Sequence, residues 1–331
     1  MSYNYPDKYF LESTCDRTDR SDEIVSRLKE YGVCILGGGV YFVRGVDMPA
    51  GTTLMGVGRA SKIVLDEDLS EGYTIKIGEY CTVKGLFVSG CAGGDIELPS
   101  VVGKRHGIIF EGSATLKDWS GQPKLPTICE CYISGFDGGG ITCNGTGYSA
   151  MSSMIVSDCQ ITNCGAGINI SYYSEYHKFT SIHCAKCLYG CINNGGNNMF
   201  SNCCFTGNKE GFLMDNSKGQ SPNNSHGSAV CCTFNHSDKN NGVGIRILGC
   251  KNGFVFSGCQ IFFSKIVTED SDGILFSDIN LGRMTDMSIK GGGLHMFTNC
   301  MFQYHSEVTV ENNENVKFIN CYTRGGEPVG V

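Results

Sequence analysis

The stretch Met296-Phe297-Thr298-Asn299-Cys300 returns 21 residues later as Lys317-Phe318-Ile319-Asn320-Cys321. Other segments also end an apolar strand in a cysteine, and successive cysteines are 28, 25, 19, 28, 28, 41 and 21 residues apart. The cysteines counted are Cys131, Cys159, Cys184, Cys203, Cys231, Cys259, Cys300 and Cys321. The step of 41 divides in two if the segment ending at Ile279 is a coil whose cysteine is replaced. A period in this range is typical of a solenoid.

A second short strand follows each cysteine, and it begins with glycine. Examples are Gly140-Ile141-Thr142-Cys143, Gly167-Ile168-Asn169-Ile170, Gly211-Phe212-Leu213-Met214 and Gly244-Ile245-Arg246-Ile247. One coil therefore holds at least two strands, and neither can bury its apolar face alone. Stacked coils would bury a continuous core and align equivalent residues about 4.8 Å apart.

The repeat therefore predicts an all-β fold, a single right-handed parallel β-helix. Its interior would hold a ladder of cysteines, and one of its turns an asparagine ladder at Asn202, Asn299 and Asn320. A leucine-rich repeat, the main rival solenoid, would need a regular leucine consensus and a helix in each repeat. Neither is present.

The N-terminal region differs from the repeat. Its apolar spacing predicts a helix over residues 21–31, with Ser21 or Asp22 as the N-cap and Gly32 at its end. Such a helix would cover the open end of the core. We therefore divide the chain into a cap at 1–36, a β-helix at 37–323 and a tail at 324–331.

Composition agrees with many short strands joined by many turns. Glycine accounts for 46 of 331 residues, and only 18% of residues are charged. The net charge of −7 argues against a nucleic-acid partner, and no segment is apolar enough to predict a membrane span.

The 20 cysteines recur beside apolar strand residues, where a free thiol behaves as a small hydrophobe. Residues 1–10 show no signal-peptide pattern. We therefore expect reduced cysteines, and a protein of the cytoplasm or of a phage particle.

Three stretches resemble the pectate-lyase-like β-helix superfamily. They are Asp16-Arg17-Thr18-Asp19-Arg20-Ser21-Asp22-Glu23-Ile24, Gly37-Gly38-Gly39-Val40-Tyr41-Phe42-Val43 and Met48-Pro49-Ala50-Gly51-Thr52-Thr53-Leu54-Met55-Gly56-Val57-Gly58. They look like the helix, strand and turn that open that fold. The superfamily holds polysaccharide lyases, polygalacturonase-like and fructan-acting glycosidases, epimerases and phage tailspikes. The resemblance implies the fold, whereas the function must be argued from a site.

Cleavage of a glycosidic bond commonly uses two carboxyl groups. Asp215 is the first candidate, because it ends a glycine-led strand beside a long polar loop, although it could simply cap a turn. His226 and Arg246 follow on the way into the next coil and on its strand. Their order is similar to polygalacturonases, but the adjacent Asp-Asp pair and the Asn-Thr-Asp motif of that family are absent here.

Two further clusters could contribute to a site. Asp270 and Asp272 lie in an acidic turn that could supply catalytic carboxyls or bind Ca²⁺, or could simply be solvated. Glu175 is a candidate acid among tyrosines whose flat faces suit sugar rings or ordinary packing. The candidate substrate contacts are Tyr172, Tyr173, Tyr176, Trp119, Arg246 and Asp238.

The function that the residues favour is a carbohydrate-active enzyme that cleaves or transfers glycosidic bonds of an oligo- or polysaccharide with paired carboxylates. One alternative is a phage tailspike or glycan-binding protein without catalysis. Another is a polysaccharide lyase or epimerase. No cofactor is expected, with Ca²⁺ kept as an alternative, and a homotrimer would be compatible with such a solenoid.

Overall fold

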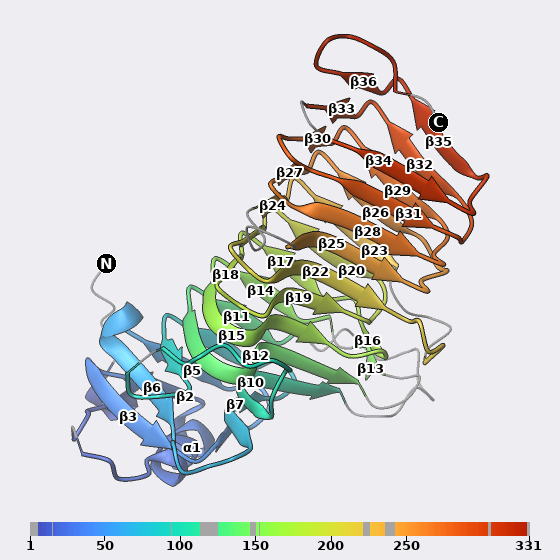
Figure 1. Ribbon diagram of the computed structural model, residues 1–331. Coiled ribbons are helices and arrows are strands. Elements are labelled where there is room, and N and C mark those ends of the chain that lie inside the picture. Colours follow the sequence, from blue (N-terminus) through green and yellow to red (C-terminus); the bar gives the residue numbers. More distant parts are fainter. Residues whose placement is uncertain are drawn as a thin grey trace.

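A computed structural model of the chain shows the parallel β-helix that the repeat predicted (Figure 1). It describes residues 6–14, 16–93, 95–112, 125–145, 150–151, 153–220, 226–235, 242–303 and 306–329. Coils stack from the capped N-terminal end to the C-terminal end, and every pair of neighbouring named strands is parallel. Consecutive coils thus bring residues about 20 to 30 positions apart into contact, as the β20–β23 register does for Asn198 and Gly227.

One face of the solenoid is a 13-stranded parallel sheet. In spatial order its strands are β1 (Phe10–Leu11), β2 (Val33–Leu36), β5 (Thr53–Gly56), β8 (Thr82–Lys84), β11 (Thr127–Cys129), β14 (Ile155–Ser157), β17 (Lys178–Thr180), β20 (Asn198–Ser201), β23 (Gly227–Val230), β26 (Phe254–Ser257), β29 (Ile274–Ser277), β32 (His295–Thr298) and β35 (Val316–Ile319). Since β1 and β2 belong to this sheet, the ladder begins within the segment assigned to the cap. The domain boundaries themselves stay a prediction.

The larger sheet bends around the core as two columns. The second column comprises β3 (Gly39–Val43), β6 (Ser61–Leu65), β9 (Phe87–Ser89), β12 (Tyr132–Gly145), β15 (Gln160–Ile170), β18 (His183–Ala185), β21 (Cys204–Thr206), β24 (Thr233–Asn235), β27 (Gln260–Phe262), β30 (Asn280–Leu281), β33 (Met301–Phe302) and β36 (Tyr322–Thr323). The third column comprises β4 (Val46–Asp47), β7 (Gly72–Ile77), β10 (Arg105–Gly112), the later parts of β12 and β15, β19 (Tyr189–Asn193), β22 (Glu210–Asp215), β25 (Val243–Leu248), β28 (Lys265–Glu269), β31 (Met287–Lys290) and β34 (Val308–Glu311).

The remaining elements are short, apart from the capping helix. They are η1 (Asp7–Tyr9), η2 (Gly58–Ala60), α1 (Ser21–Tyr31), and the strands β13 (Ala150–Met151) and β16 (Ser174–Glu175), which pair with each other. Ile24 and Leu28 of α1 are fully buried against the first coil. Within the described ranges, no helix combines the length and apolarity needed to cross a bilayer.

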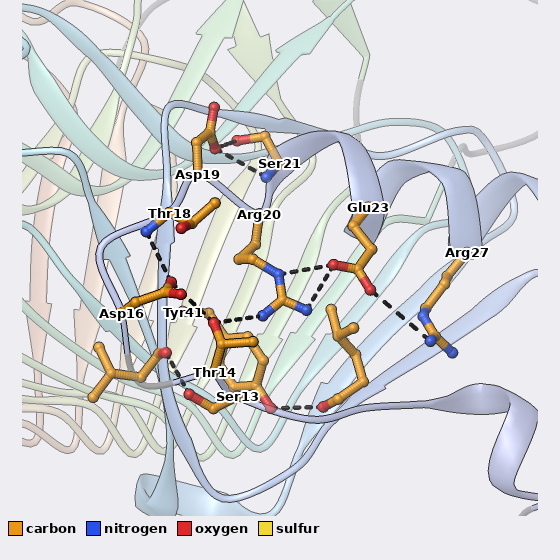
Figure 2. Close-up of polar contacts among 12 residues, drawn as sticks. Ser13, Thr14, Asp16, Thr18, Asp19, Arg20, Ser21, Glu23, Arg27 and Tyr41 are labelled. Carbon is orange, nitrogen blue, oxygen red and sulfur yellow. Dashed lines mark hydrogen bonds and ion pairs between the residues drawn. The ribbon is translucent and has the colours of Figure 1, made fainter.

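The capping helix ends as predicted but starts differently. Gly32 closes it with a φ of +73°, the left-handed conformation that favours glycine. Neither Ser21 nor Asp22 is the N-cap, because the helix begins at Ser21 and Arg20 occupies the N-cap position. The side chain of Asp19, one residue earlier, binds the first residue of the helix instead. Its Oδ1 accepts from the Ser21 backbone N–H at 3.0 Å and from the Ser21 hydroxyl at 2.6 Å (Figure 2). Arg20, at the N-cap position, instead binds Glu23 through Nε at 2.8 Å.

The glycines that open the third-column strands form a ladder. A Cβ on Gly190 would lie 2.5 Å from the carbonyl oxygen of Gly211, and one on Gly211 would lie 2.5 Å from that of Gly244. Gly107, Gly140 and Gly167 meet the next glycine in the same way, at 2.4 to 3.0 Å. The backbones of successive coils therefore approach too closely for any side chain at this corner, which explains the glycine-led strands of the repeat.

The predicted cysteine ladder exists, but two of its members are different residues. We call the turn between a strand of the 13-stranded sheet and the next strand of the second column the first turn of a coil. The buried position after this turn holds Cys131, Cys159, Ile182, Cys203, Cys232, Cys259, Ile279, Cys300 and Cys321. Cys184 lies on β18 instead, and Cys231 occupies the turn with a φ of +53°. Ile279 replaces a cysteine as expected.

Each ladder thiol has a backbone partner. Cys232, for example, donates to the carbonyl oxygens of Val230 at 3.4 Å and Phe200 at 3.6 Å. The described cysteines form no disulfide, and their redox state stays a prediction.

Two other ladders accompany the thiols. Phenylalanine rings stack inside the 13-stranded sheet, with the centroids of Phe276 and Phe297 4.8 Å apart and 3° from coplanar. In the first turn, Asn320 donates to Asn299 at 3.4 Å, and Asn299 to Asp278 at 3.2 Å. Asn202 occupies the same turn on a distant coil, so the asparagine ladder is shorter than predicted.

Candidate functional site

Asp215 ends β22 and caps the turn that follows. Its Oδ1 accepts hydrogen bonds from the Ser217 backbone N–H at 2.9 Å and from the Ser217 hydroxyl at 2.7 Å. Its own backbone N–H donates to Oδ1 of Asn194, on the preceding coil, at 2.9 Å. These bonds fix the half-buried carboxylate at the outer face of the third column.

A row of outward positions runs along the third column through Asp215. In the register of β22, β25 and β28, Asp215 pairs with Leu248, and Leu248 pairs with Glu269. Lys290 and Glu311 continue the row. Two sheet steps of about 4.8 Å place the Cα atoms of Asp215 and Glu269 about 9.6 Å apart. We name Asp215, Leu248 and Glu269 the carboxylate row.

The two acids of the row differ in their surroundings. Asp215 is held by its turn, whereas Glu269 is exposed and no described residue bonds to its carboxylate. Half-buried Leu248 lies between them and offers an apolar surface. The arrangement can therefore present two carboxylates to one ligand across an apolar floor.

Two predicted tyrosines lie beside the row. The Tyr173 hydroxyl donates to the backbone carbonyl of Gln220, in the loop after Asp215, at 3.2 Å. Burial, and next the charge of Asp215, raise the pKa of Tyr172. The structure thus brings Tyr172 near Asp215 and Tyr173 to the loop after it, although the tyrosines lie about 40 positions away in the sequence.

Arg246 lies on β25 and pairs in register with Leu213 of β22. Its side chain forms an ion pair with Glu210, an acid that the sequence analysis did not select. Its Nε and Nη2 each donate to a carboxylate oxygen of Glu210, both at 3.0 Å. Burial, and next the charge of Glu210, raise the pKa of Tyr189, its neighbour on β19. Only their positions in the repeat could have indicated that Tyr189 and Glu210 are neighbours, because each residue directly precedes a glycine of the ladder.

Glu175 and Tyr176 are held elsewhere, by the turn at 194–197. Oε2 of Glu175 accepts from the Asn197 side chain at 3.1 Å. Tyr176 has a φ of +63°, and its backbone N–H donates to the Gly196 carbonyl at 3.2 Å. These bonds account for both residues without a role in the carboxylate row.

The other predicted acids follow the row directly. Asp270 is exposed in a turn with a φ of +48°, and its backbone N–H donates to the Lys290 carbonyl. Oδ1 of Asp272 accepts from the Leu294 backbone N–H at 2.7 Å. Asp272 therefore has a turn-forming role, whereas no described residue bonds to the carboxylates of Glu269 and Asp270. Of these two, Glu269 is the acid that lies in the carboxylate row.

The remaining predicted residues are less informative. His226 is half-buried, and its Nδ1 atom is buried without a hydrogen-bond partner. Trp119 and Asp238 lie outside the described residues. In the described part of the chain, no three His, Cys, Asp or Glu side chains gather as a metal site would require, and Ca²⁺ stays an untested alternative.

Comparison with known proteins gives structural neighbours only. No protein-family model and no curated protein matches the sequence. Among solved structures, the enzymatically active domain of tailspike protein 2 of bacteriophage CBA120 matches with a TM-score of 0.53 and 15% identity, over 93% of this chain and 45% of that one. The chain thus spans less than half the length of that neighbour.

Two further neighbours have similar scores. Tailspike protein gp49 of the Acinetobacter baumannii bacteriophage Fri1 has a TM-score of 0.54 and 13% identity, covering 99% of this chain and 65% of that one. The A-module of the Azotobacter vinelandii mannuronan C-5 epimerase AlgE4 has a TM-score of 0.50 and 11% identity, covering 95% and 94%. At these identities the likeness shows the fold alone. The chain shares the parallel β-helix fold with these solved structures, which is the fold that the sequence resemblance implied.

Proposed function

We propose that this protein is a carbohydrate-active enzyme that binds an oligo- or polysaccharide on the outer face of the third column. Cleavage or transfer of a glycosidic bond would use Asp215 and Glu269 as the paired carboxyls. The observation that carries the proposal is the sheet register, which places these two acids in one row, two steps apart.

The separation suits an inverting mechanism. The two carboxyl groups of inverting glycosidases stand about 6.5 to 9.5 Å apart, against about 5 to 5.5 Å in retaining enzymes. Side chains that start about 9.6 Å apart on one face can place their carboxyl groups in the wider range. Water would then enter between the sugar and one carboxylate, while the other carboxyl protonates the leaving oxygen.

Neighbouring side chains supply the contacts that a sugar needs. Leu248 offers an apolar surface between the acids, and Tyr172 lies beside Asp215. Arg246 carries five N–H donors, of which two are used on Glu210. Aromatic and apolar faces with polar groups around them are typical of carbohydrate sites.

The activities named for the structural neighbours agree with this substrate class. Gp49 of phage Fri1 is described as a capsular polysaccharide depolymerase, and the CBA120 domain as enzymatically active. A location on a phage particle and a homotrimeric assembly belong to the same proposal. Light scattering of the purified protein measures the assembly directly.

The proposal is tested by turnover of capsular and other bacterial polysaccharides, followed as release of reducing ends. The wild-type protein is expected to cleave at least one of them. Asp215→Asn and Glu269→Gln should each lower kcat by about 100-fold or more, as expected for loss of an acid or base. Proton NMR of the first product should show inversion at the anomeric carbon.

Glu311→Gln is the matched control, because Glu311 lies on the same row, two further steps from Glu269. It should keep full activity. Full activity in both Asp215→Asn and Glu269→Gln would refute the site. Retention of a glycan without any product would instead favour the non-catalytic tailspike or glycan-binding alternative. The hydrogen bond from the Ser217 hydroxyl to Asp215 is consistent with that alternative, because it gives the carboxylate a structural role. An unsaturated or epimerised product would identify a lyase or epimerase.

A further inference from the structure

A second polar cluster lies several coils from the carboxylate row, where β12 is irregular. The pairing of β12 with β15 shifts register between Phe136 and Gly139, which marks a β-bulge. Bulges re-aim side chains and are common beside active sites. Here the bulge presents Asp137 next to His106 of the preceding coil.

The protonation state of His106 follows from its partners. Its Nδ1 accepts from the Gly139 backbone N–H at 2.9 Å and lies 3.0 Å from Oγ1 of Thr142. A backbone N–H can only donate, so in the neutral ring the proton must sit on Nε2. Burial lowers the pKa of His106, which favours this neutral form, while the charge of Asp137 acts in the opposite direction.

The Nε2–H of His106 is an unused donor. No described residue accepts a hydrogen bond from it, and His106 as a whole is half-buried. Asp137 is half-buried, and its Oδ1 accepts from the Arg105 backbone N–H at 2.9 Å. Its second oxygen is an unused acceptor among the described residues.

The surroundings hold this donor and acceptor in place. A Cβ on Gly103 would lie 2.4 Å from the carboxyl carbon of Asp137, and one on Gly138 would lie 2.7 Å from Nδ1 of His106. A side chain at Gly103 would displace the Asp137 carboxylate, and one at Gly138 would also meet the Arg105 carbonyl oxygen, 2.6 Å from its Cβ. The Arg105 guanidinium is anchored by the backbone carbonyls of Gly90 at 2.7 Å and Asp66 at 3.3 Å. The orientations of the His106 ring and the Asp137 carboxylate are therefore fixed before a ligand binds.

From this geometry we infer a second ligand site, in which Asp137 and the Nε2–H of His106 bind neighbouring hydroxyl groups of a sugar. One hydroxyl donates to the carboxylate, and the next accepts from the imidazole. A fixed acceptor beside a fixed neutral donor matches a vicinal diol, since each hydroxyl can donate and accept. An anion would be repelled by Asp137, and a cation would leave the imidazole donor unused.

The site lies on the same third column as the candidate catalytic face. His106 opposes Gly139 across the bulge, Gly139 pairs with Ala166, Ala166 with Tyr189, and Tyr189 with Glu210. Four sheet steps separate His106 from Glu210, about 19 Å at 4.8 Å per step. Asp215 lies five residues further along β22, so the sugar site is separate from the carboxylate row and does not depend on the catalytic proposal.

The test uses simple sugars and the full chain. The methyl glycosides of glucose, galactose and mannose serve as probes, with cyclohexanol as a six-membered ring that has one hydroxyl. Binding is followed by the ¹⁵Nε2 and proton shifts of His106 in long-range ¹H–¹⁵N spectra. At least one glycoside should shift these signals and saturate, whereas cyclohexanol should not.

Two variants and one matched control complete the test. His106→Ala and Asp137→Asn should each weaken glycoside binding at least tenfold. Glu111→Gln alters an exposed acid on the same strand, β10, and should bind as wild type. Wild-type affinity in Asp137→Asn, or no His106 shift with any glycoside in the wild-type protein, would overturn the inference. Asp215→Asn and Glu269→Gln should leave this binding intact, so the two sites can fail separately.

Discussion

Arg246 on β25 and Glu210 on β22 form a two-point ion pair across one step of the sheet, with both N–H···O distances at 3.0 Å. Their side chains are only 27% and 20% exposed. The pair fixes the guanidinium at one end of the candidate catalytic face. Its geometry favours a stronger interaction than an exposed pair provides, because bidentate bonds are aligned and little screened.

A double-mutant cycle of Glu210→Gln and Arg246→Met should measure a coupling free energy of about 1 kcal/mol or more. The measurement is the free energy of unfolding in urea. Lys104 and Glu71 are the control pair, since they are also 3.0 Å apart but 77% and 66% exposed. Their coupling should be near zero, and equal coupling in the two cycles would contradict the argument.

The glycine ladder predicts a sharp penalty for a single methyl group. Gly211→Ala would force a Cβ to within 2.5 Å of the Gly244 carbonyl oxygen, so the coils must separate locally. We expect a loss of about 1 to 3 kcal/mol in unfolding free energy. Gly93→Ala is the control, because nothing lies within 4 Å of its added Cβ. If Gly211→Ala had the stability of the wild-type protein, the two coils could separate at this corner without a measurable loss of free energy, contrary to the prediction.

The architecture could be predicted from the sequence because its constraints repeat. A glycine is needed wherever successive backbones touch, and an apolar cysteine or isoleucine follows the first turn of every coil from Cys131 to Cys321, where the chain faces the core. The register was harder to predict. Cys184 and Cys231 were placed in the ladder, yet Ile182 and Cys232 occupy those positions, since the preceding turn accepts residues as different as Ser181 and Cys231.

The site was less predictable because its neighbours come from different coils. Glu269 stood in the acidic cluster that we singled out, but only the register shows that it shares a row with Asp215. Local bonds were equally hidden, such as the Ser217 contacts of Asp215. His106 and Asp137 left no sequence signal, because a bulge has no fixed composition.

The adjacent cysteines 231 and 232 should differ strongly in reactivity. Cys231 is exposed in its turn, whereas Cys232 is buried and the pKa of its thiol is raised to about 12. At pH 8 about one Cys232 in 10⁴ would be ionised, and the thiolate is the reactive form. Iodoacetamide followed by peptide mass spectrometry should label Cys231 and leave Cys232 unmodified. In urea both should react, and comparable labelling of the folded protein would refute the buried ladder.

His177 should make the fold sensitive to acid. It is fully buried, with Nε2 2.7 Å from the Ser174 hydroxyl and Nδ1 accepting from the Met154 backbone N–H at 3.3 Å. Burial lowers its pKa to about 3, against about 6.5 in the unfolded chain. Between these values only the unfolded chain binds the proton, so stability falls as pH falls. From pH 6.5 to 4.5 the loss from this residue is about 2 kcal/mol.

The check is the slope of unfolding free energy against pH, compared between proteins. His177→Gln should flatten the slope between pH 6.5 and 4.5, whatever it does to stability at pH 7. The pKa values of His106 and His295 are lowered by burial as well, so part of the slope should remain. Parallel curves for the wild-type and His177→Gln proteins would show that His177 becomes protonated within the fold.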